Sequence, residues 1–378
     1  MDRANKLLVR YNGKLVGTMA LYKNTLAAFE YDKEWLADGF SISPFSLPLE
    51  QQVFMPRQEP FDGLYGVFSD SLPDGWGRLL TDRLLLKNKV NPMQISSMDR
   101  LAIVGSSGMG ALTYEPDYHF EMSKEGTSLD LDRIAEECAS ILKTDYSDDL
   151  DTLFKLGGSS GGARPKILTE IDGEEWIVKF PSSEDSKNIG EQEYKYSICA
   201  KKCGIVMEET KLFPSKLSSG YFGTKRFDRI VEDNGKMKRI HMISASGILE
   251  TSHRIPNLDY NILMKLTLEL TRDFVQIEKL FRVMCFNVFA HNRDDHSKNF
   301  TYLYDDNEEK WILSPAYDLT YSYSIGGEHA TTVNGNAKNP SMTDIIEVAK
   351  NIGFKEKKAK NIADEIKMIV DEHGLSIL

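Results

Sequence analysis

The first part of the chain alternates hydrophobic and polar residues over short runs. Two such runs, LLVRY and KLVGTMAL, flank Asn12-Gly13, a pair that favours a type I′ turn, so the pattern predicts a β-hairpin. In DSLPDGWGRLLTDRLLLKNK, apolar residues recur at helical spacing after Asp74, which is a suitable N-cap. We therefore expect a helix there, and the segment MDRLAIVGSSGMGALTYEP completes this part of the chain.

The middle of the chain has the pattern of a loop, a strand, a tight turn and a second strand. LGGSSGGARPK, residues 156–166, is a glycine-rich turn, and the strand ILTEI, an Asp172-Gly173 turn and the strand EWIVKF follow it. A helix fits residues 191–202 and ends at Gly204, which can adopt a left-handed conformation. Further β-like segments extend to residue 247.

From Asp259 onward the pattern is mainly helical. NFTYLY and KWILS flank DDNEE as a hairpin that ends at SPAYDLT, and the last forty residues are amphipathic helix. Apolar residues at near-helical spacing predict a helix that leads into HNRDDHSKNF, residues 291–300; these apolar residues are Ile277, Leu280, Phe281, Met284 and Val288.

The composition is that of an ordinary globular protein. The 378 residues, 41% of them hydrophobic, suffice for two or three structural units. The net charge of −11 disfavours a protein that covers a nucleic acid backbone by itself, because such binding needs clustered cations. We find neither a secretory signal nor an apolar run long enough for a membrane span, so we expect a cytoplasmic protein that has no contact with a membrane.

Four cysteines are too few for a disulfide framework in a chain of this length. Cys199 and Cys203 are the only close pair, and their spacing places them on one face of a helix. No pair of histidines lies near them in the sequence, so we expect two buried thiols and not a metal site.

The glycine-rich turn and a lysine after it could bind phosphate. Backbone N–H groups of such a turn can approach phosphates because no side chain blocks them. It is not a P-loop, because Ala163-Arg164 stands where Lys-Ser/Thr is required, and a flexible surface turn is the alternative. Lys179 ends the hairpin after the turn, and the helix after it carries Glu191 and Glu193, as in a kinase lobe. An edge-strand lysine exposed to water is the alternative for Lys179.

The strongest chemical signal lies in residues 291–300. Asp294 and Asn299 have the Asp-x4-Asn spacing of a kinase catalytic loop, in which the aspartate accepts the proton of the substrate hydroxyl. Asp318 follows at the end of the next hairpin, and carboxylate and amide oxygens suit Mg²⁺. A polar turn between helix and strand would explain the segment alone, but not the kinase-like order of the parts around it.

Taken in order, GGSSGGARPK, WIVKF, RFDR, NRDDHSKN and SPAYDLT resemble the HipA-type serine/threonine kinases of bacterial toxin–antitoxin systems. SLPDGWGR and RLAIVGSSGMGAL resemble the small N-terminal domain of those proteins. The resemblance implies an α+β fold, in which a small β-rich domain precedes a bilobal protein-kinase-like domain with a mainly helical C-terminal lobe. The expected regions are an N-terminal domain (1–120), an acidic helical linker (121–150), an ATP-binding region like a kinase N-lobe (151–250) and a mainly helical catalytic lobe (251–378).

The resemblance also implies roles for individual residues. Asp294 would be the catalytic base, Asn299 and Asp318 the Mg²⁺ ligands, and Lys179 the lysine that holds the ATP phosphates. His296 either takes part in catalysis or orients the loop by hydrogen bonding. The other residues expected at the nucleotide are Gly161, Gly162, Ala163, Arg164, Pro165, Lys166, Ile243, Ser244, Ala245 and Tyr317.

Members of this family can autophosphorylate a serine ahead of the glycine-rich turn, and Ser159 is the aligned candidate, with Ser160 adjacent. A phosphoserine adds roughly −1.5 to −2 charge where the triphosphate must lie, so it would push the loop out and switch the kinase off. Alternatively, both serines only make the turn flexible. Asp295 stands where the best-known family pattern has glycine. A carboxylate there could raise the pKa of Asp294 or help to bind a metal or a cationic substrate, but we interpret Asp295 as a solvated residue.

The expected function is that of an ATP- and Mg²⁺-dependent serine/threonine protein kinase, the toxin of a toxin–antitoxin pair. The resemblance implies an aminoacyl-tRNA synthetase, most familiarly the glutamyl enzyme, as substrate. It implies a HipB-like helix-turn-helix antitoxin as partner, through which alone DNA would be contacted. Two alternatives remain: a small-molecule phosphotransferase on the same core, and a catalytically silent corepressor that binds the antitoxin.

Overall fold

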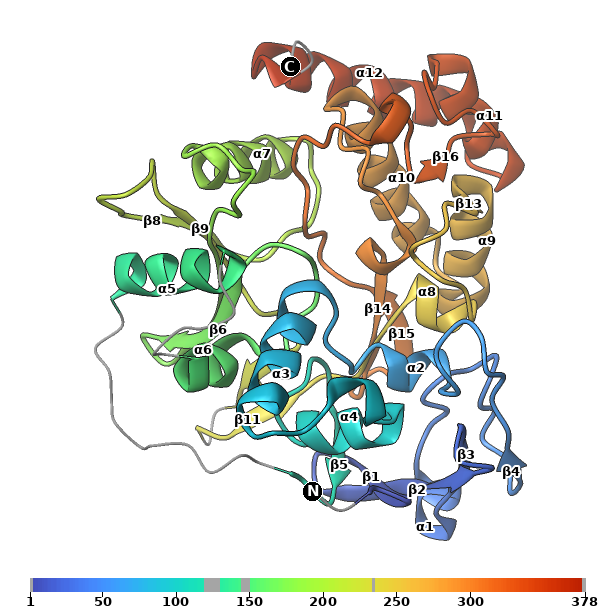
Figure 1. Cartoon of the computed structure of the whole chain (residues 1–378). Coiled ribbons are helices and arrows are strands. Elements are labelled where there is room, and N and C mark those ends of the chain that lie inside the picture. The colour runs from blue at the N-terminus through green and yellow to red at the C-terminus, as the bar shows by residue number, and fades with distance from the viewer. Residues whose placement is uncertain (1–2, 119–129, 144–149, 233–234, 376–378) are drawn as a thin grey trace. The chain divides into compact units, whose positions relative to one another are not determined.

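The computed structural model describes residues 3–118, 130–143, 150–232 and 235–375 (Figure 1). The chain forms two compact units, which we describe separately. The first unit consists of Met1–Glu191, Lys211–Ile243 and Gly247–Thr251, and the second of Gln192–Thr210, Ser244–Ser246 and Ser252–Leu378. Helices and strands occur in both units, as expected for an α+β fold.

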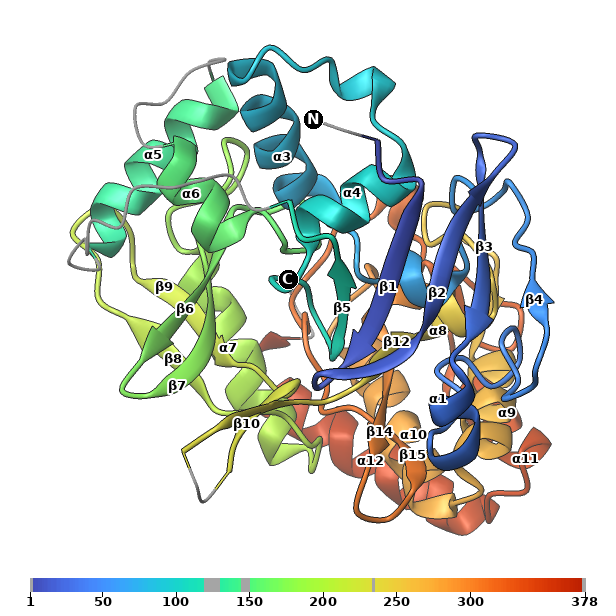
Figure 2. The ribbon, with the colours of Figure 1, turned by 90° about the horizontal axis from the view of Figure 1, so that it is seen from below.

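An antiparallel five-stranded sheet opens the first unit, in the order β4-β3-β2-β1-β5 (Figure 2). The predicted hairpin is confirmed, because Asn12 and Gly13 both have positive φ, as a type I′ turn requires. The strands are β1 (Lys6–Tyr11), β2 (Lys14–Tyr22), β3 (Leu26–Tyr31), β4 (Val53–Phe54) and β5 (Leu112–Glu115).

The helices of the first unit include the one predicted after Asp74, which is α3. Most of the described part of the predicted acidic linker (121–150) is helical, as α5 and the first residue of α6, whereas residues 121–129 and 144–149 lie outside the described residues. The elements are α1 (Lys33–Asp38), α2 (Gly66–Ser69), α3 (Gly75–Lys87), η1 (Pro92–Gln94), α4 (Ser97–Val104), α5 (Leu131–Lys143) and α6 (Leu150–Gly157).

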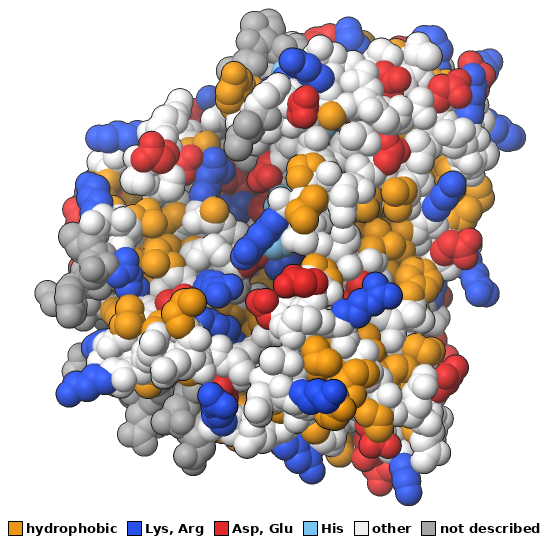
Figure 3. Space-filling model, turned by 45° about the vertical axis from the view of Figure 1, so that its right-hand side comes forward, with side chains coloured by type: hydrophobic (Ala, Val, Ile, Leu, Met, Phe, Trp, Pro, Cys, Tyr) orange, Lys and Arg blue, Asp and Glu red, His pale blue; other side chains and the backbone are white. Residues whose placement is uncertain are grey.

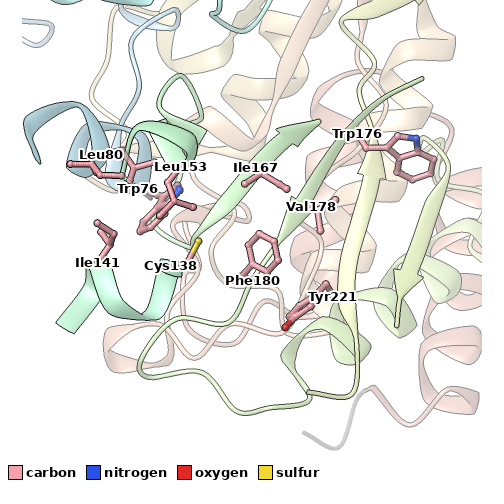
Figure 4. Packing of buried hydrophobic residues seen from close by; sticks show 11 residues of the cluster. Trp76, Leu80, Cys138, Ile141, Leu153, Ile167, Trp176, Val178, Phe180 and Tyr221 are labelled. Carbon is pink, nitrogen blue, oxygen red and sulfur yellow. The ribbon is translucent and has the colours of Figure 1, made fainter. Parts of the chain in front are cut away.

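A second sheet of the first unit has the order β6-β7-β9-β8 and contains the predicted Asp172-Gly173 hairpin. One buried cluster joins this sheet to α3, α5 and α6 (Figure 4). Its members are Trp76, Leu80, Cys138, Ile141, Leu150, Leu153, Ile167, Trp176, Val178, Phe180 and Tyr221. The strands are β6 (Lys166–Ile171), β7 (Glu174–Lys179), β8 (Thr210–Phe213) and β9 (Tyr221–Lys225).

Three short strands and one helix follow before the chain enters the helical region. β10 and β11 pair antiparallel, and β12 and α8 each contain residues of both units. Their bounds are β10 (Arg229–Val231), β11 (Met237–Arg239), β12 (Met242–Ser244) and α8 (Ala245–Ile248).

The second unit is mainly helical, as predicted. In α10 the five apolar residues at near-helical spacing are all buried, and α10 packs against α9 and α12 (Figure 1). The final amphipathic stretch is two helices, because Gly353 has a φ of 82° and separates α11 from α12. The helices are α7 (Ile189–Lys202), α9 (Tyr260–Thr271), α10 (Phe274–Phe289), η2 (Ser297–Asn299), η3 (Ile325–Gly327), α11 (Met342–Asn351) and α12 (Glu356–Glu372).

The strands of the second unit are short. The predicted hairpin is confirmed as β14 (Thr301–Asp305) and β15 (Lys310–Leu313), whereas β13 (Leu258–Asp259) and β16 (Thr331–Thr332) form a parallel pair. Gly204 ends α7 with a φ of 72°, and Cys199 and Cys203 are buried free thiols, both as predicted.

The surface carries charge of both signs. On the face drawn in Figure 3, basic and acidic side chains are interspersed. Within the described ranges, the helices lack the combination of length and apolar character that a membrane crossing demands.

Candidate functional site

The glycine-rich loop (residues 156–166) begins in the last turn of α6 and ends at the first residue of β6. Ser160 is buried, and its N–H and its Oγ–H both donate to the carbonyl of Gly157, at 3.1 and 2.6 Å. Ser159 is half-buried and donates its Oγ–H to the carbonyl of Ser107 at 2.9 Å. These contacts argue against a flexible surface turn, while Gly161, Gly162 and Ala163 between the anchored ends are exposed.

The turn that begins α3 packs directly on this loop. Asp74 occupies the N-cap position, but the expected capping hydrogen bond is absent, and its carboxylate accepts the N–H of Gly162 instead. The backbone N–H of Trp76 donates to the carbonyl of Gly162 at 2.9 Å, and its indole N–H donates to the carbonyl of Lys166 at 3.1 Å. A Cβ atom at Gly75 would collide with the Gly162 carbonyl, so glycine permits this close approach.

A buried ion-pair cluster holds the segment that carries Ser107. Asp228 is fully buried and accepts two hydrogen bonds from Arg226, one from Arg229 and one from the N–H of Gly110. Arg229 and Arg239 also donate to the carbonyls of residues 108 and 110. The RFDR motif is therefore structural, because it fixes the 105–111 segment on which Ser159 rests.

Two lysines face each other at the loop end of the β6–β7 hairpin. Lys166 and Lys179 are direct partners in the strand register, so their side chains leave the same face of the sheet. Their neighbours Ile167 and Val178 point to the opposite face, into the buried cluster. The Nζ of Lys179 lies 5.5 Å from the ring centroid of Phe222. The hairpin thus places two lysine side chains, that of Lys166 buried, beside the glycine-rich loop.

Arg164 is directed away from the loop by an ion pair. Its guanidinium donates two hydrogen bonds, both of 3.1 Å, to the carboxylate of Asp185. Burial alone would raise the pKa of Asp185, but hydrogen bonds from Ser182 and the charge of Arg164 outweigh it and lower this pKa. Pro165 is also anchored, because its carbonyl accepts the N–H of Phe180 at 2.8 Å. A contact of Arg164 with a nucleotide would therefore involve its backbone, whereas the carbonyl of Pro165 is already engaged.

In the second unit, the segment 291–300 follows directly on α10. Asp294 is exposed, with 66% of its side chain accessible. The side-chain N–H of Asn299 donates to the backbone carbonyl of Asp294 at 2.6 Å, so the amide oxygen of Asn299 points away from that carbonyl. The Nε2 of His296 lies 3.9 Å from the Asp294 carboxylate, and the His296 ring packs at 5.5 Å on the ring of His253. The Nδ1 of His296 is buried and has no hydrogen-bond partner among the described residues.

Asp295 is not the solvated residue that we expected. It is 1% exposed, and its carboxylate accepts hydrogen bonds from Tyr260 Oη–H at 2.9 Å and from the N–H of Thr331 at 3.1 Å. The Nδ1 of His329 lies 3.0 Å from the same carboxylate. Asn287 donates to Tyr260 Oη and so extends the network into α10. Asp295 thus anchors the segment, because protein groups take the place of the water molecules that would otherwise solvate its carboxylate.

Tyr317 brings the SPAYDLT segment to the same place. Its hydroxyl donates to the carbonyl of Lys298 at 2.5 Å and lies 2.6 Å from Thr301 Oγ1. Asp318 follows with a φ of 54°, a left-handed conformation that aspartate tolerates better than most residues. Asp294, His296, Asn299, Tyr317 and Asp318 therefore belong to one structural neighbourhood of the second unit.

The segment expected beside the adenine is buried. Ile243 and Ala245 are fully buried and Ser244 is 5% exposed. The N–H of Ala245 donates to the carbonyl of Phe300 at 2.7 Å, so this amide is already engaged. Ile243 belongs to the first unit, and Ser244 and Ala245 to the second.

The donor set suits a Mg²⁺ ion that phosphate and water complete. Asn299 and Asp318 offer one amide oxygen and one carboxylate, both hard ligands, and Mg²⁺ in phosphoryl-transfer sites commonly takes only one or two protein ligands. Within the ranges that the structure describes, no group of three or more His, Cys, Asp or Glu side chains is placed to hold a metal. A dedicated cage of protein ligands, as for structural zinc, is therefore not seen there.

The sequence did not reveal two of the residues that shape these sites. Asp74 was expected to cap a helix, and its contact with Gly162 joins residues 88 positions apart. Asp295 was expected in solvent, and its partners lie between 34 and 36 residues away. The sequence offers one signal for Asp295, which is its position directly after the candidate Asp294. Two neighbouring carboxylates repel each other, which favours different surroundings for the two side chains.

Comparisons with known proteins cover nearly the whole chain. The model of the HipA N-terminal domain matches residues 7–115, and that of the HipA-like C-terminal domain matches residues 158–373. The protein named "Putative kinase Y4mE" of Sinorhizobium fredii (strain NBRC 101917 / NGR234) is 27% identical in an alignment of 341 residues, which covers 83% of this chain and 76% of that protein. The HipA chain in the Shewanella oneidensis MR-1 complex of HipA, HipB and operator DNA superposes with a TM-score of 0.73 and 17% identity, over 98% of this chain and 90% of that one.

Proposed function

The chain belongs to the HipA family, and from this premise we propose that it is an ATP- and Mg²⁺-dependent serine/threonine protein kinase that acts as the toxin of a toxin–antitoxin pair. A HipA-type kinase is supported by both family models and by the relative that is named a kinase. The observation that carries the finer proposal is the exposed carboxylate of Asp294, whose loop is fixed by Asn299 and by the buried Asp295.

The chemistry proposed for these residues is an in-line phosphoryl transfer. The carboxylate of Asp294 aligns the serine or threonine hydroxyl and accepts its proton, while the hydroxyl oxygen bonds to the γ-phosphorus and the bond to the β,γ-bridging oxygen breaks, releasing ADP. Asn299 and Asp318 would hold Mg²⁺, which neutralises phosphate charge when it is bound. Lys179 and Lys166 offer cations to the phosphates, and His296 offers the buried Nδ1 as a hydrogen-bonding group. Catalysis would rest mainly on positioning and charge.

Ser159 is the better candidate for autophosphorylation. The hydroxyl of Ser160 is buried and bonded to Gly157, whereas Ser159 is half-exposed. Phosphorylation would remove the hydrogen that Ser159 donates to Ser107 and place negative charge beside Gly161 and Gly162. The modified loop should therefore bind ATP poorly.

The proposed partner is a HipB-like helix-turn-helix antitoxin. The Shewanella protein that shares this fold is described in a complex with HipB and operator DNA. With a net charge of −11, this chain would contact DNA through such a partner and not by coating the phosphate backbone itself. For the substrate we propose an aminoacyl-tRNA synthetase, with the glutamyl enzyme tested first.

The test is transfer of the labelled γ-phosphate of ATP in the presence of Mg²⁺, followed by peptide mapping of residues 156–166. We expect label on Ser159, label on added glutamyl-tRNA synthetase, and loss of both in Asp294→Ala. Glu308→Ala is the matched control, because Glu308 is similarly exposed, at 63%, and lies in the β14–β15 turn. Transfer by Asp294→Ala at the wild-type rate would overturn the role of Asp294. Transfer to small hydroxyl compounds but not to protein would favour the small-molecule phosphotransferase.

A further inference from the structure

The glycine-rich loop is held by a part of the chain that precedes it by more than eighty residues. Three hydrogen bonds connect the turn at the start of α3 with the loop: Gly162 N–H to the Asp74 carboxylate, Trp76 N–H to the Gly162 carbonyl, and Trp76 indole N–H to the Lys166 carbonyl. All of these residues belong to the first compact unit. The first two bonds engage the two peptide groups that flank the Cα of Gly162, through its N–H on one side and its carbonyl on the other.

The contact at Gly162 restricts a residue that would otherwise have large conformational freedom. Gly162 is exposed and has a φ of 84°, and glycine loses more conformational freedom on ordering than any other residue. A hydrogen bond to a carboxylate is stronger than one between neutral groups, so Asp74 is a stronger acceptor than a backbone carbonyl would be. Because the carboxylate takes the Gly162 amide, the backbone on either side, at Gly161 and Ala163, is set in a defined direction.

We propose that Asp74 is a positioning residue for nucleotide binding: by accepting the Gly162 N–H, it holds the glycine-rich loop in the conformation that receives the ATP phosphates. This inference rests on the proposed function, since the loop position matters to the reaction only if the loop binds ATP. Asp74 acts through Gly162 and forms no bond with the reacting atoms. The N-terminal region is thereby assigned a part in the kinase reaction, because the residue lies within the stretch that matches the HipA N-terminal domain.

The test compares Asp74→Ala with Asp74→Asn, because an asparagine side chain keeps an oxygen acceptor but loses the charge. Asp82→Ala is the matched control: Asp82 lies on the same helix, where its carboxylate pairs with Arg78 and Arg100. The first readout is hydrogen exchange of peptides covering residues 157–166 without nucleotide, and the second is KM for ATP and kcat measured separately.

For Asp74→Ala we expect exchange in these peptides about tenfold faster and KM for ATP about tenfold higher, the size of one lost hydrogen bond to a charged group, with kcat changed much less. Asp74→Asn should retain most of the protection and most of the affinity, and Asp82→Ala should match the wild type in both readouts. A merely structural role would lower the thermal midpoint without this split between KM and kcat.

Two results would overturn the inference. One is unchanged exchange in the loop of Asp74→Ala. The other is a lower KM in that variant, which would mean that Asp74 competes with the phosphates for the Gly162 amide. Should Asp74→Ala fail to fold, Gly77→Ala serves instead. Alanine is a better helix former than glycine, so α3 should persist, but the added Cβ would collide with the Ser160 carbonyl and displace the loop. KM for ATP should therefore rise in this variant as well. A wild-type protein that uses no ATP would refute the proposed function, whereas an active wild type with variants indistinguishable from it would refute only the role of Asp74.

Discussion

Asp294 and Asp295 are adjacent in the chain, yet their side chains are 66% and 0% accessible to solvent. The exposed carboxylate can meet a substrate, while the buried one bonds to Tyr260, His329 and Thr331. Burial, followed by the charge of Asp295, raises the pKa of Tyr260 well above its usual value, so this tyrosine remains a hydrogen-bond donor. The exposed aspartate is therefore accessible for the proposed catalysis, while the buried one holds the segment in place.

Replacing these two residues should change stability to very different extents. Asp295→Ala leaves the buried donors of Tyr260 and Thr331 without their acceptor, and we expect the free energy of unfolding to fall by about 3 kcal/mol. Asp294→Ala removes an exposed side chain, and we expect a change within roughly 0.5 kcal/mol. Urea unfolding of both variants measures this difference. Equal stabilities would show that the Asp295 network contributes little.

How far single residues could be predicted depends on the range of the interaction. Asn12-Gly13, Asp172-Gly173 and Gly204 all adopt the positive φ angles that their local sequences indicated. Local geometry needs only neighbours in the chain, so these predictions hold. The burial of Asp295 depends on groups that β16 and α9 supply. Its local sequence, an acidic pair in a polar turn, indicated solvent.

At the scale of elements, the β6–β7 hairpin concentrates charge where the glycine-rich loop ends. Directly opposed residues share a face, so Lys166 and Lys179 present two cations together. The sequence predicted the hairpin and singled out both lysines, but which residue lies opposite Lys179 depends on the register of the two strands. A register shift of one residue would have placed the side chain of Lys179 in the core.

We expect Lys179→Met and Lys166→Met each to weaken ATP binding about tenfold or more, because each removes a cation that would face phosphate in the proposed nucleotide site. Methionine preserves the length of the apolar stem, so the strands should stay intact. Lys225→Met on the neighbouring strand β9 is the control, since Lys225 pairs with Glu174. Titration of ATP against each variant measures the dissociation constant. Unaltered affinity in both loop-end variants would remove the lysine pair from the nucleotide site.

The cluster around Asp228 should make the first unit sensitive to acid. Burial by itself would raise the pKa of Asp228, but the charges of Arg226 and Arg229 outweigh it and hold this pKa well below the usual range. A carboxylate with a depressed folded-state pKa contributes stability that is complete above its unfolded pKa of about 4 and is lost as the pH falls toward the folded value.

The free energy of unfolding should therefore decrease as the pH falls below about 4, and Asp228→Asn should show a flatter profile there. Asp228→Asn should also be less stable than the wild type at neutral pH, because two buried guanidinium groups lose their counter-charge. Denaturant unfolding at a series of pH values measures both effects. Parallel profiles for the variant and the wild type would contradict this prediction.

At the scale of the whole molecule, the N-terminal region and the glycine-rich loop share one core. Trp76 and Leu80 of α3 are buried in the same cluster as Ile167, Trp176 and Val178 of the second sheet. The family models divide the chain between residues 115 and 158, but packing continues across that division within the first unit. Sequence patterning could not show this, because the apolar face of a helix does not identify the surface that covers it.

Removal of residues 1–118 should therefore unfold more than the part that is removed. The remaining chain would expose the apolar surface that Trp76 and Leu80 cover, and we expect the sheet of β6, β7 and β9 to lose cooperative unfolding. Thermal denaturation followed by circular dichroism tests this expectation. Co-expression of residues 1–118 should restore the transition, and a truncated chain that melts like the full one would show two independent domains.

The contacts of Asp74 and Trp76 with the glycine-rich loop also bear on inheritance. They bind together two stretches that separate family models recognise. A recombination event that joined the N-terminal stretch of one lineage to the C-terminal stretch of another would unite a turn and a loop with no shared history. Natural chimaeras with a junction between them should accordingly be rare, and the two stretches should descend as a single heritable block.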